Sequence, residues 1–314
     1  GLDDQGLDDQ GLDDQGLDEP PLSSYRLGDS QGMLKIELEP TFTLSWVRGD
    51  ETLLTFDQEG IQVAWVEEKR SNLSYDPYPK LLDTEAVISP INVDWTSISE
   101  ASVVDTKDNE LTLLLRLNNG YQLWMRWRWE ESGRVKCDLI TDARREGDRR
   151  SHPYAAYFVI QPLIDSQEGL YGLGEVYDAV NQRGYLKAMQ LELDLELEER
   201  YNEVHAPIPY AVGSRGWGLF VPSDSPAAFD MGKRDSERLS AHFGGGRWGS
   251  GGPLLDLEEW MTLSHQAERS EEGRSRIQGI SFYLFSEPNP LDLTRHYYEV
   301  SGWPKLPAPW ALGP

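Results

Sequence analysis

A row of carboxylates between positions 192 and 198 is the first feature of this sequence that could take part in chemistry. Glu192, Asp194, Glu196 and Glu198 alternate with leucines, and this period of two puts the acidic side chains on one face of an extended strand. Carboxylates accept hydrogen bonds from hydroxyl groups, and such bonds to a charged group contribute about 1.5–3 kcal/mol. The row therefore has two interpretations: a face that meets only solvent, or a surface that binds the hydroxyl groups of a ligand.

Acid–base chemistry would need a histidine and a carboxylate that face one substrate. His205 with Glu175 or Glu203 is a conceivable pair, but the spacing of these residues does not support it. The five histidines show no metal-ligand spacing. Gly172 and Gly174 lack the context of a dinucleotide-binding loop and instead indicate positive φ or a close backbone approach. The sequence therefore predicts no catalytic residue, no metal site and no cofactor.

Short strands with alternating apolar residues must position these side chains. The clearest hairpin places leucines at the four odd positions of 111–117 before Asn119-Gly120, a pair that tolerates the positive φ of a type I′ turn, and apolar residues at odd positions over 121–129 after it. Near-continuous apolar runs over 155–160 and 277–285 are typical of strands buried in a sandwich. Cys137 is expected in the core, and as the only cysteine it excludes an internal disulfide. The patterns predict an antiparallel, all-β domain.

A helix is expected near the end of the sequence. Asn289 can cap it, and the proline that follows suits the first helical position. Leu293, Tyr297 and Val300 would lie on one side of the helix, and Gly302 can end it. Prolines at 304, 307 and 309 then favour an extended crossing to another unit.

Two sets of residues resemble glycoside hydrolase family 31, the α-glucosidase and α-xylosidase group. The first is Tyr171-Gly172-Leu173-Gly174-Glu175 with Gln182-Arg183-Gly184, followed by HAPIPY over 205–210 and GWGLFV over 216–221, which has the pattern of a buried strand. The second is DLTRHYYEVSGWP over 292–304 with PAPWALG over 307–313. The first set is similar to the family's N-terminal β-sandwich and the second to the passage into its catalytic barrel. The resemblance covers about residues 31–314.

The resemblance implies a galactose-mutarotase-like antiparallel β-sandwich, or supersandwich, over residues 31–287, and a short linker helix with the start of a barrel over 288–314. It also implies an N-domain loop that contacts the sugar on the leaving-group side, where the family commonly has Asn-x-Asp. Glu192-Leu193-Asp194 is the nearest match, with Glu in place of Asn. Asp194 and Glu192 are thus the candidate substrate-binding residues.

The family's catalytic carboxylates lie on the barrel, and its nucleophile motif, Trp-x-Asp-Met-Asn-Glu or close to it, is absent from these 314 residues. The resemblance therefore implies the N-terminal domain of a retaining α-glycosidase, inactive without its barrel. Its partners would be an α-glycoside substrate and that downstream barrel.

Two other classes of function stay open. A free-standing carbohydrate-binding module would need exposed aromatic rings, and the candidates are Trp124, on the polar face of its strand, and Trp248, in a glycine-rich stretch over 244–252. Trp127 and Trp129 fall instead on the apolar face and are expected in the core. A mutarotase-like sugar epimerase would need the acid–base pair built on His205.

Charge and composition narrow the partners. The formal net charge is −25, from 54 acidic and 29 basic residues, which argues against nucleic acid because phosphate binding depends on clustered Lys and Arg. No run of about 18 apolar residues appears, so no membrane span is expected. Residues 1–30 begin with GLDDQ repeats and are predicted to form a disordered acidic tether. The compartment is not determined; the missing initiator Met favours an exported, extracytoplasmic protein.

Overall fold

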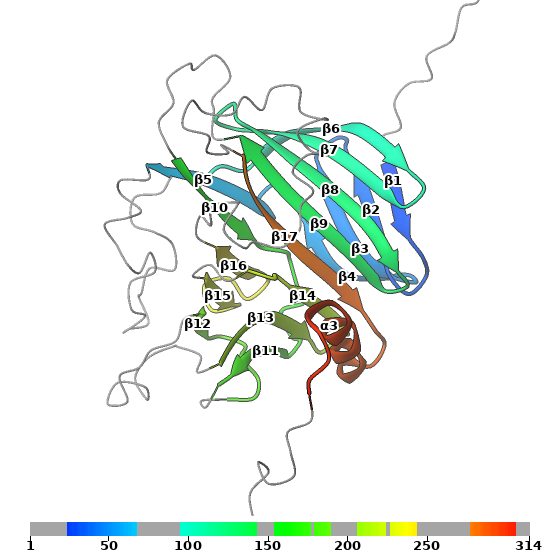
Figure 1. The fold of residues 1–314 in the computed structure, drawn as a ribbon, viewed down its shortest axis with the longest axis vertical. Helices are drawn as coiled ribbons and strands as arrows, with labels where there is room; N and C mark the ends of the chain where they lie inside the picture. The colour runs from blue at the N-terminus through cyan, green and yellow to red at the C-terminus, as the bar shows by residue number, and fades with distance from the viewer. Residues whose placement is uncertain are drawn as a thin grey trace, which may run out of the picture.

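A computed structural model describes residues 24–67, 95–142, 154–176, 179–189, 206–223, 227–243 and 277–305 of the chain. These residues form antiparallel strands, one 3-10 turn and one α-helix (Figure 1). The strands are β1 (Ser24–Gly28), β2 (Met33–Glu37), β3 (Thr43–Arg48), β4 (Glu51–Phe56), β5 (Ile61–Glu67), β6 (Ile98–Lys107), β7 (Glu110–Leu117), β8 (Gln122–Glu131), β9 (Arg134–Asp142), β10 (Tyr154–Ile160), β11 (Leu170–Glu175), β12 (Leu186–Met189), β13 (Ala206–Gly213), β14 (Trp217–Phe220), β15 (Ala227–Met231), β16 (Leu239–Phe243) and β17 (Ile277–Ser286). The turn is η2 (Pro290–Asp292), and the helix is α3 (Leu293–Ser301).

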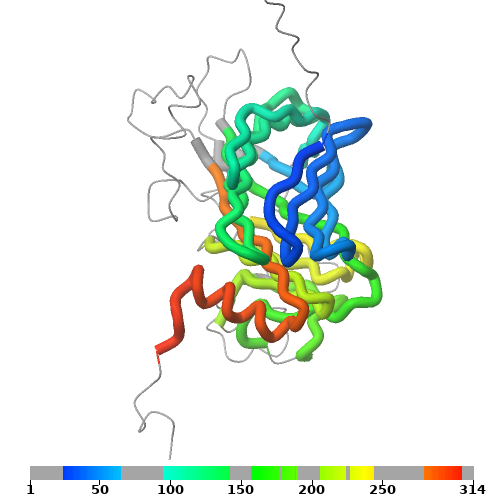
Figure 2. Tube along the Cα trace, turned by 90° about the vertical axis from the view of Figure 1, so that its right-hand side faces the viewer, coloured from blue at the N-terminus to red at the C-terminus, as the bar shows by residue number. Residues whose placement is uncertain are grey.

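The strands build three antiparallel sheets. The first sheet has the order β1-β2-β3-β4, the second β12-β15-β16-β10-β5, and the third β11-β13-β14-β17-β9-β8-β7-β6. Figure 2 shows the first sheet, in blue, lying against the cyan and green strands of the third. β17 pairs with β14 on one side and with β9 on the other, and so joins the two halves of the third sheet. The antiparallel β-sandwich predicted from the sequence is confirmed.

Alternating apolar residues of β7 and β8 face the core, as the period of two predicts, but the turn between them differs from the prediction. A type I′ turn needs positive φ at both central residues. Of Asn119 and Gly120, only Gly120 has a positive φ, of 84°. Its amide donates to Leu117 O at 2.9 Å, and Leu117 N donates to Tyr121 O at 2.9 Å. The loop therefore spans three residues, 118–120, and needs the left-handed conformation only at its closing glycine.

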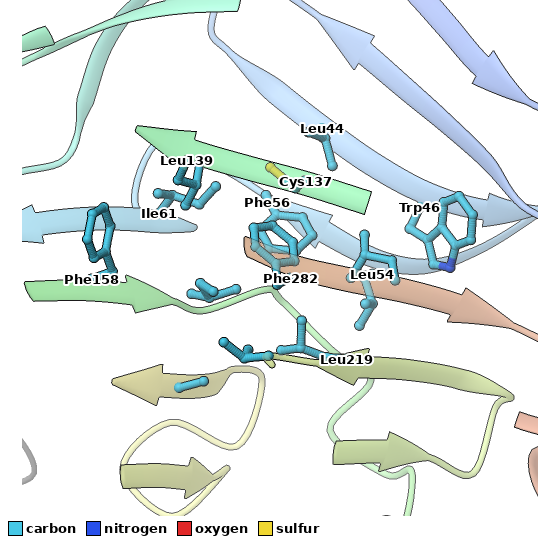
Figure 3. Packing of buried hydrophobic residues seen from close by; sticks show 14 of the residues in the cluster. Leu44, Trp46, Leu54, Phe56, Ile61, Cys137, Leu139, Phe158, Leu219 and Phe282 are labelled. Carbon is cyan, nitrogen blue, oxygen red and sulfur yellow. The ribbon is translucent and has the colours of Figure 1, made fainter. Parts of the chain in front are cut away.

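One hydrophobic core joins the three sheets (Figure 3). Phe56 of β4 packs on Phe282 of β17 with ring centroids 6.3 Å apart, and Trp127 of β8 meets the same ring edge-on at 5.4 Å. Trp46 is fully buried, and its Nε1 donates to a backbone oxygen of β17 at 3.1 Å. The predictions that Trp127 and Cys137 lie in the core are confirmed. Burial raises the pKa of the Cys137 thiol well above its ordinary value, so this side chain behaves as an apolar group.

The ordered sandwich begins earlier than the sequence predicts. β1 falls within residues 1–30, the predicted acidic tether, yet it pairs with β2 from Ser24 opposite Glu37 to Gly28 opposite Met33. Leu27 is buried, and Tyr25 packs against the core. Residues 24–28 therefore belong to the sandwich, because the strand pairing and these apolar side chains hold them in place. Residues 1–23 lie outside the described part of the chain.

The helix α3 packs on the third sheet through the side that the sequence predicted. Leu293 is fully buried, and Tyr297 and Val300 pack against the same aromatic cluster. Tyr210 of β13 donates from its hydroxyl to Leu293 O at 3.1 Å, and its ring stacks on Tyr297 at 5.0 Å. No helix within the described residues is long and apolar enough to cross a membrane.

The residues that cap and end the helical segment are the predicted ones, but the α-helix itself starts later than predicted. Asn289 accepts a hydrogen bond from Leu291 N at 3.2 Å and caps η2, whose first residue is Pro290. The capped turn is thus 3-10, and the α-helix starts only at Leu293. Gly302 ends α3 with a φ of 100°, as predicted.

Candidate functional site

A strained bulge shapes the end of β11, the edge strand of the third sheet. Gly172, Leu173 and Gly174 all have positive φ, at 102°, 70° and 96°, and the pairing with β13 shifts register between the two glycines. A Cβ at Gly172 would lie 2.2 Å from Tyr210 O, and one at Gly174 would lie 1.9 Å from Ala206 O. Leu173 is fully buried and, among the described residues, is the only one besides glycines with positive φ. Such backbone strain concentrates at functional sites.

The bulge borders the segment that carries the acidic row. β12 ends at Met189 on the edge of the second sheet, and β13 begins at Ala206, opposite Glu175. Residues 190–205 therefore connect the second sheet to the third at this end of the sandwich. We call the two stretches Gly172–Glu175 and Ala206–Pro207 the bulge rim.

The structure places only part of the predicted site. The candidates outside the described residues are Glu192, Asp194, Glu203, His205 and Trp248. Glu175 ends β11 with an exposed side chain, opposite the residue that follows His205 in the sequence. Trp124 is half-buried on β8, a strand of the third sheet far from the bulge rim in strand order. The bulge rim thus pairs Glu175 with Ala206, the first described residue after the acidic row, and leaves Trp124 apart.

Arg183, in the Gln182-Arg183-Gly184 motif, ties the loop before β12 to two neighbouring loops. Its guanidinium donates to three backbone oxygens, those of Glu168 at 2.5 Å, Asp165 at 2.6 Å and Ser236 at 2.8 Å. Hydrogen bonds to charged groups are worth more than neutral ones, about 1.5–3 kcal/mol. Arg183 therefore positions the backbone that leads into β11, at the end of this strand away from Glu175.

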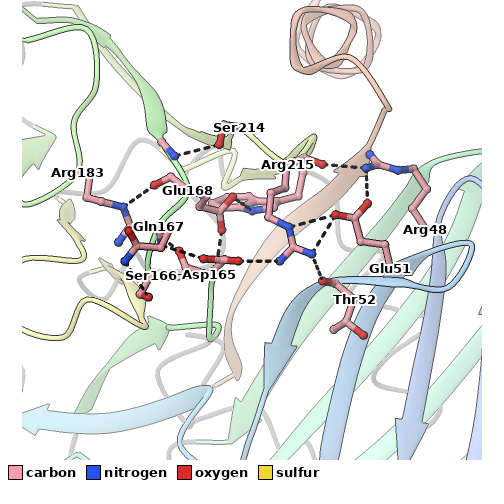
Figure 4. Close-up of polar contacts among 12 residues, drawn as sticks. Arg48, Glu51, Thr52, Asp165, Ser166, Gln167, Glu168, Arg183, Ser214 and Arg215 are labelled. Atoms are coloured by element: carbon pink, nitrogen blue, oxygen red, sulfur yellow. Dashed lines mark hydrogen bonds and ion pairs between the residues drawn. The ribbon is translucent and has the colours of Figure 1, made fainter.

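A buried carboxylate, Glu168, supports the start of β11 (Figure 4). Its Oε2 accepts from Trp217 Nε1 at 2.8 Å, and its Oε1 accepts from Asp165 N at 3.2 Å. Burial raises the pKa of Glu168, and the hydrogen bonds from Trp217 and Asp165 partly oppose this rise. Gly213 leaves room for the pair, since a Cβ there would lie 2.2 Å from the Trp217 ring. Because both oxygens are engaged inside the fold, Glu168 serves to position β14.

A group of charged side chains clamps the β13–β14 turn to the first sheet (Figure 4). Arg215 donates from Nε and Nη2 to Glu51 Oε1 at 3.1 and 2.9 Å, while Arg48 donates to Glu51 Oε2 at 2.8 Å. Arg48 also donates to Glu287 O at 2.6 Å, just after β17. Burial alone would raise the pKa of Glu51, but the hydrogen bonds from Arg215 and Arg48 outweigh it and lower that pKa.

The sequence patterns did not identify Glu168, Arg183 and Arg215 as positioning residues. A signal was present, because each of the three directly precedes a glycine at a strand end or a turn. At each of these places the polar side chain can bind a neighbouring backbone group, and the glycine that follows lets the backbone turn. These charged groups contact other parts of the fold at the Leu170–Gly213 end of the β11–β13 pair, opposite to the end that carries Glu175.

Comparisons with known proteins agree with this geometry. No family model matches the chain. The chain is similar to the alpha-xylosidase XylQ of Lactiplantibacillus pentosus, with 22% identity over 158 residues that cover 50% of this chain and 16% of that protein. It is similar in structure to a GH31 family sulfoquinovosidase from E. rectale, with a TM-score of 0.50 and 15% identity, covering 87% of this chain and 35% of that one. A cycloalternan-forming enzyme from Listeria monocytogenes gives a TM-score of 0.49 and 12% identity over 92% of this chain and 32% of that chain.

The chain spans only 16% of the curated relative and 35% of the sulfoquinovosidase. Its described residues are almost all antiparallel strands, followed by one short helix. The resemblance carried by the glycine and tryptophan motifs is therefore confirmed: the chain has the β-sandwich fold of the N-terminal domains of glycoside hydrolase family 31.

Proposed function

We propose that this chain is the N-terminal domain of a retaining α-glycosidase, where it supports a catalytic barrel and helps to form the sugar-binding pocket. The similarity to an α-xylosidase supports a glycoside substrate, and the small share of the relatives that the chain covers supports a domain of a larger enzyme. The observation that carries the proposal is the bulge rim. Its buried Leu173 is strained between two glycines that tolerate no side chain, and Glu175 at the end of the bulge pairs with Ala206, the first described residue after the acidic row.

In this proposal the sandwich supplies neither the acid nor the nucleophile. Retaining glycosidases use two carboxylates about 5 Å apart, and the resemblance assigns both to the barrel. Asp194, with Glu192 beside it, would accept hydrogen bonds from hydroxyl groups of the leaving sugar. Those bonds would orient the leaving group during the reaction.

The C-terminal end of the described chain is suited to contact another unit. Trp303 is 64% exposed and lies beside Tyr298, with ring centroids 5.5 Å apart, and Leu291 is 80% exposed. Leu291 precedes α3 and Trp303 follows it, so they lie at opposite ends of the helix that Tyr210 fastens to the sandwich. Exposed apolar surface of this kind favours association.

The first experiment measures hydrolysis by the purified chain alone. Aryl α-glucosides, α-xylosides and α-galactosides should remain intact, because the carboxylate pair required for retaining hydrolysis is not expected in this domain. Turnover at about 1 per second or faster would overturn the proposal. Release of the opposite anomer from a free sugar would instead support the epimerase, and saturable sugar binding by the chain alone would support the binding module.

The second experiment tests Asp194 in a protein that joins this chain to its barrel. Asp194→Ala should lower kcat/KM for a disaccharide by about 10- to 100-fold, as the loss of hydrogen bonds to a charged group predicts. An activated aryl glycoside should lose much less, because its leaving group lacks those hydroxyls. Glu198→Ala, in the same acidic row, is the matched control and should change neither value. Equal losses on both substrates would indicate a folding defect, and no loss would return Asp194 to a solvated face.

A further inference from the structure

His296 is a fully buried histidine at the contact between α3 and the third sheet. Its ring stacks on Phe285 with centroids 5.6 Å apart and planes 14° apart, which restricts its orientation. The Nε2 atom lies 2.9 Å from Glu287 Oε1, which also accepts from Arg295 at 2.8 Å. Because that carboxylate oxygen can only accept, Nε2 carries a proton and donates it to Glu287.

The other ring nitrogen of His296 has no such partner. Nδ1 is buried and makes no hydrogen bond, although it lies 3.3 Å from Glu131 Oε1. With the proton on Nε2, the Nδ1 atom of the neutral ring can only accept, and a carboxylate oxygen beside it cannot donate to it. A metal cation would bind both atoms.

Two carboxylates complete a ligand set around this nitrogen. Glu131 at the end of β8 and Glu299 on α3 each offer an oxygen, and these atoms and a nitrogen of His296 all lie within 4.8 Å of one another. A cation at their centre would be within about 2.8 Å of each, so side-chain shifts of less than about 1 Å would reach the 2.0–2.2 Å bonds of zinc to nitrogen and oxygen. The side chains of Glu131 and Glu299 are 43% and 32% exposed, so a cation can reach them from solvent.

Arg134 is the cation that these carboxylates contact in the structure. Its Nη1 lies 3.1 Å from Glu131 Oε1 and 3.1 Å from Glu299 Oε2, and its Nε lies 3.2 Å from Glu130 Oε2. Arg134 brings the two carboxylates together in front of His296. A metal at this place would displace Arg134 from Glu131 and Glu299, and Glu130 would remain the partner of Arg134.

We propose that Glu131, His296 and Glu299 bind one divalent cation of the zinc class and thereby fasten α3 to the β8–β9 hairpin. Imidazole nitrogen and Asp or Glu oxygen are both zinc ligands, and the imidazole favours zinc over magnesium or calcium. The hydrogen bond from Nε2 to Glu287 is the outer contact that metal-binding histidines usually have. Sequence spacing does not show this site, because β8 and α3 are far apart in the chain and meet only in the fold (Figure 1).

The test is a titration of the chelator-treated, folded chain with zinc chloride. We expect one zinc ion per chain by calorimetry and a rise in Tm of about 3 °C or more at saturating zinc. Glu299→Gln should weaken zinc binding by about tenfold or more, since removal of even an outer contact costs 10- to 100-fold. Glu130→Gln is the matched control, because Glu130 contacts Arg134 but contributes no ligand, and its affinity should stay within about threefold of the wild type.

His296→Gln removes the central ligand but also changes the core, so Glu299→Gln on the partly exposed face keeps the proposal falsifiable. No saturable zinc binding by the wild-type chain would overturn the proposal. Equal affinity of the wild type and Glu299→Gln would overturn it too, by showing that zinc binds elsewhere on the chain.

Discussion

Replacing His242 with leucine is expected to protect the sandwich against acid. His242 lies on β16 and is 9% exposed, and Trp95 meets the edge of its ring at 5.7 Å. Its Nδ1 is buried without a hydrogen bond. Burial, together with the positive charge of Arg234, lowers the pKa of His242 from 6.5 to about 3. The ring is therefore neutral in the folded protein over a range in which the unfolded chain is protonated.

The sign and size of the effect follow from proton linkage. Between about pH 3 and 6.5 the unfolded state binds more protons than the folded state, so stability rises with pH across this window and falls as pH is lowered. At about pH 4.5 the wild type should lose about 3 kcal/mol through His242 relative to neutral pH. His242→Leu abolishes this loss, and at neutral pH it should change stability by less than about 1.5 kcal/mol, because the volumes are similar.

Urea denaturation followed by tryptophan fluorescence at about pH 7 and 4.5 would measure the effect. The expected result is that His242→Leu gains about 3 kcal/mol more over the wild type at acid pH than at neutral pH. Ser240→Ala, on the same face of β16, is the matched control and should shift stability equally at both pH values. A stability difference for His242→Leu that does not depend on pH would refute the assignment of a buried neutral ring.

Three further outcomes follow from the structure. Gly174→Ala should destabilise the fold by about 3 kcal/mol, because it adds a close contact to an unfavourable φ. Gly184 has a φ of 84° but nothing within 4 Å of an added Cβ, so Gly184→Ala should cost only about 1 kcal/mol. Equal losses of stability in thermal melts of the two variants would contradict this reasoning. Trp217→Phe should cost about 1.5–3 kcal/mol through the hydrogen bond to Glu168 alone, and an unchanged Tm would show that this bond is not needed. Trp303→Ser should reduce self-association in sedimentation and leave Tm nearly unchanged; a large fall in Tm would show that the ring packs on the sandwich.

Local patterns predicted much of the fold. Alternating leucines identified β7, and the capping and glycine signals located the helix around Leu293. Gly172 and Gly174 were expected to need positive φ or close approach, and they do both. The positive φ of Leu173 was not predictable, because leucine avoids that conformation and only the pairing of β11 with β13 imposes it.

The remaining features depend on residues that are distant in the sequence. Arg183 binds carbonyl groups that only the folded loops bring near it, and Glu131 meets His296 only when α3 docks on the sheet. Strand order is likewise a property of the whole chain. The role of Asp194 stays a prediction, because it rests on a resemblance at a position outside the described residues.

The position of β17 in the middle of the third sheet affects how this domain folds during synthesis. β17, near the end of the described chain, lies between β14 and β9 in the third sheet. During synthesis β14 and β9 therefore each keep one edge of unpaired backbone groups until residues 277–286 emerge from the ribosome. Open edges pair readily with other chains, and contacts between distant residues slow folding. Nascent chains shorter than residue 286 should therefore depend on chaperones, and expression fragments cut before β17 should aggregate.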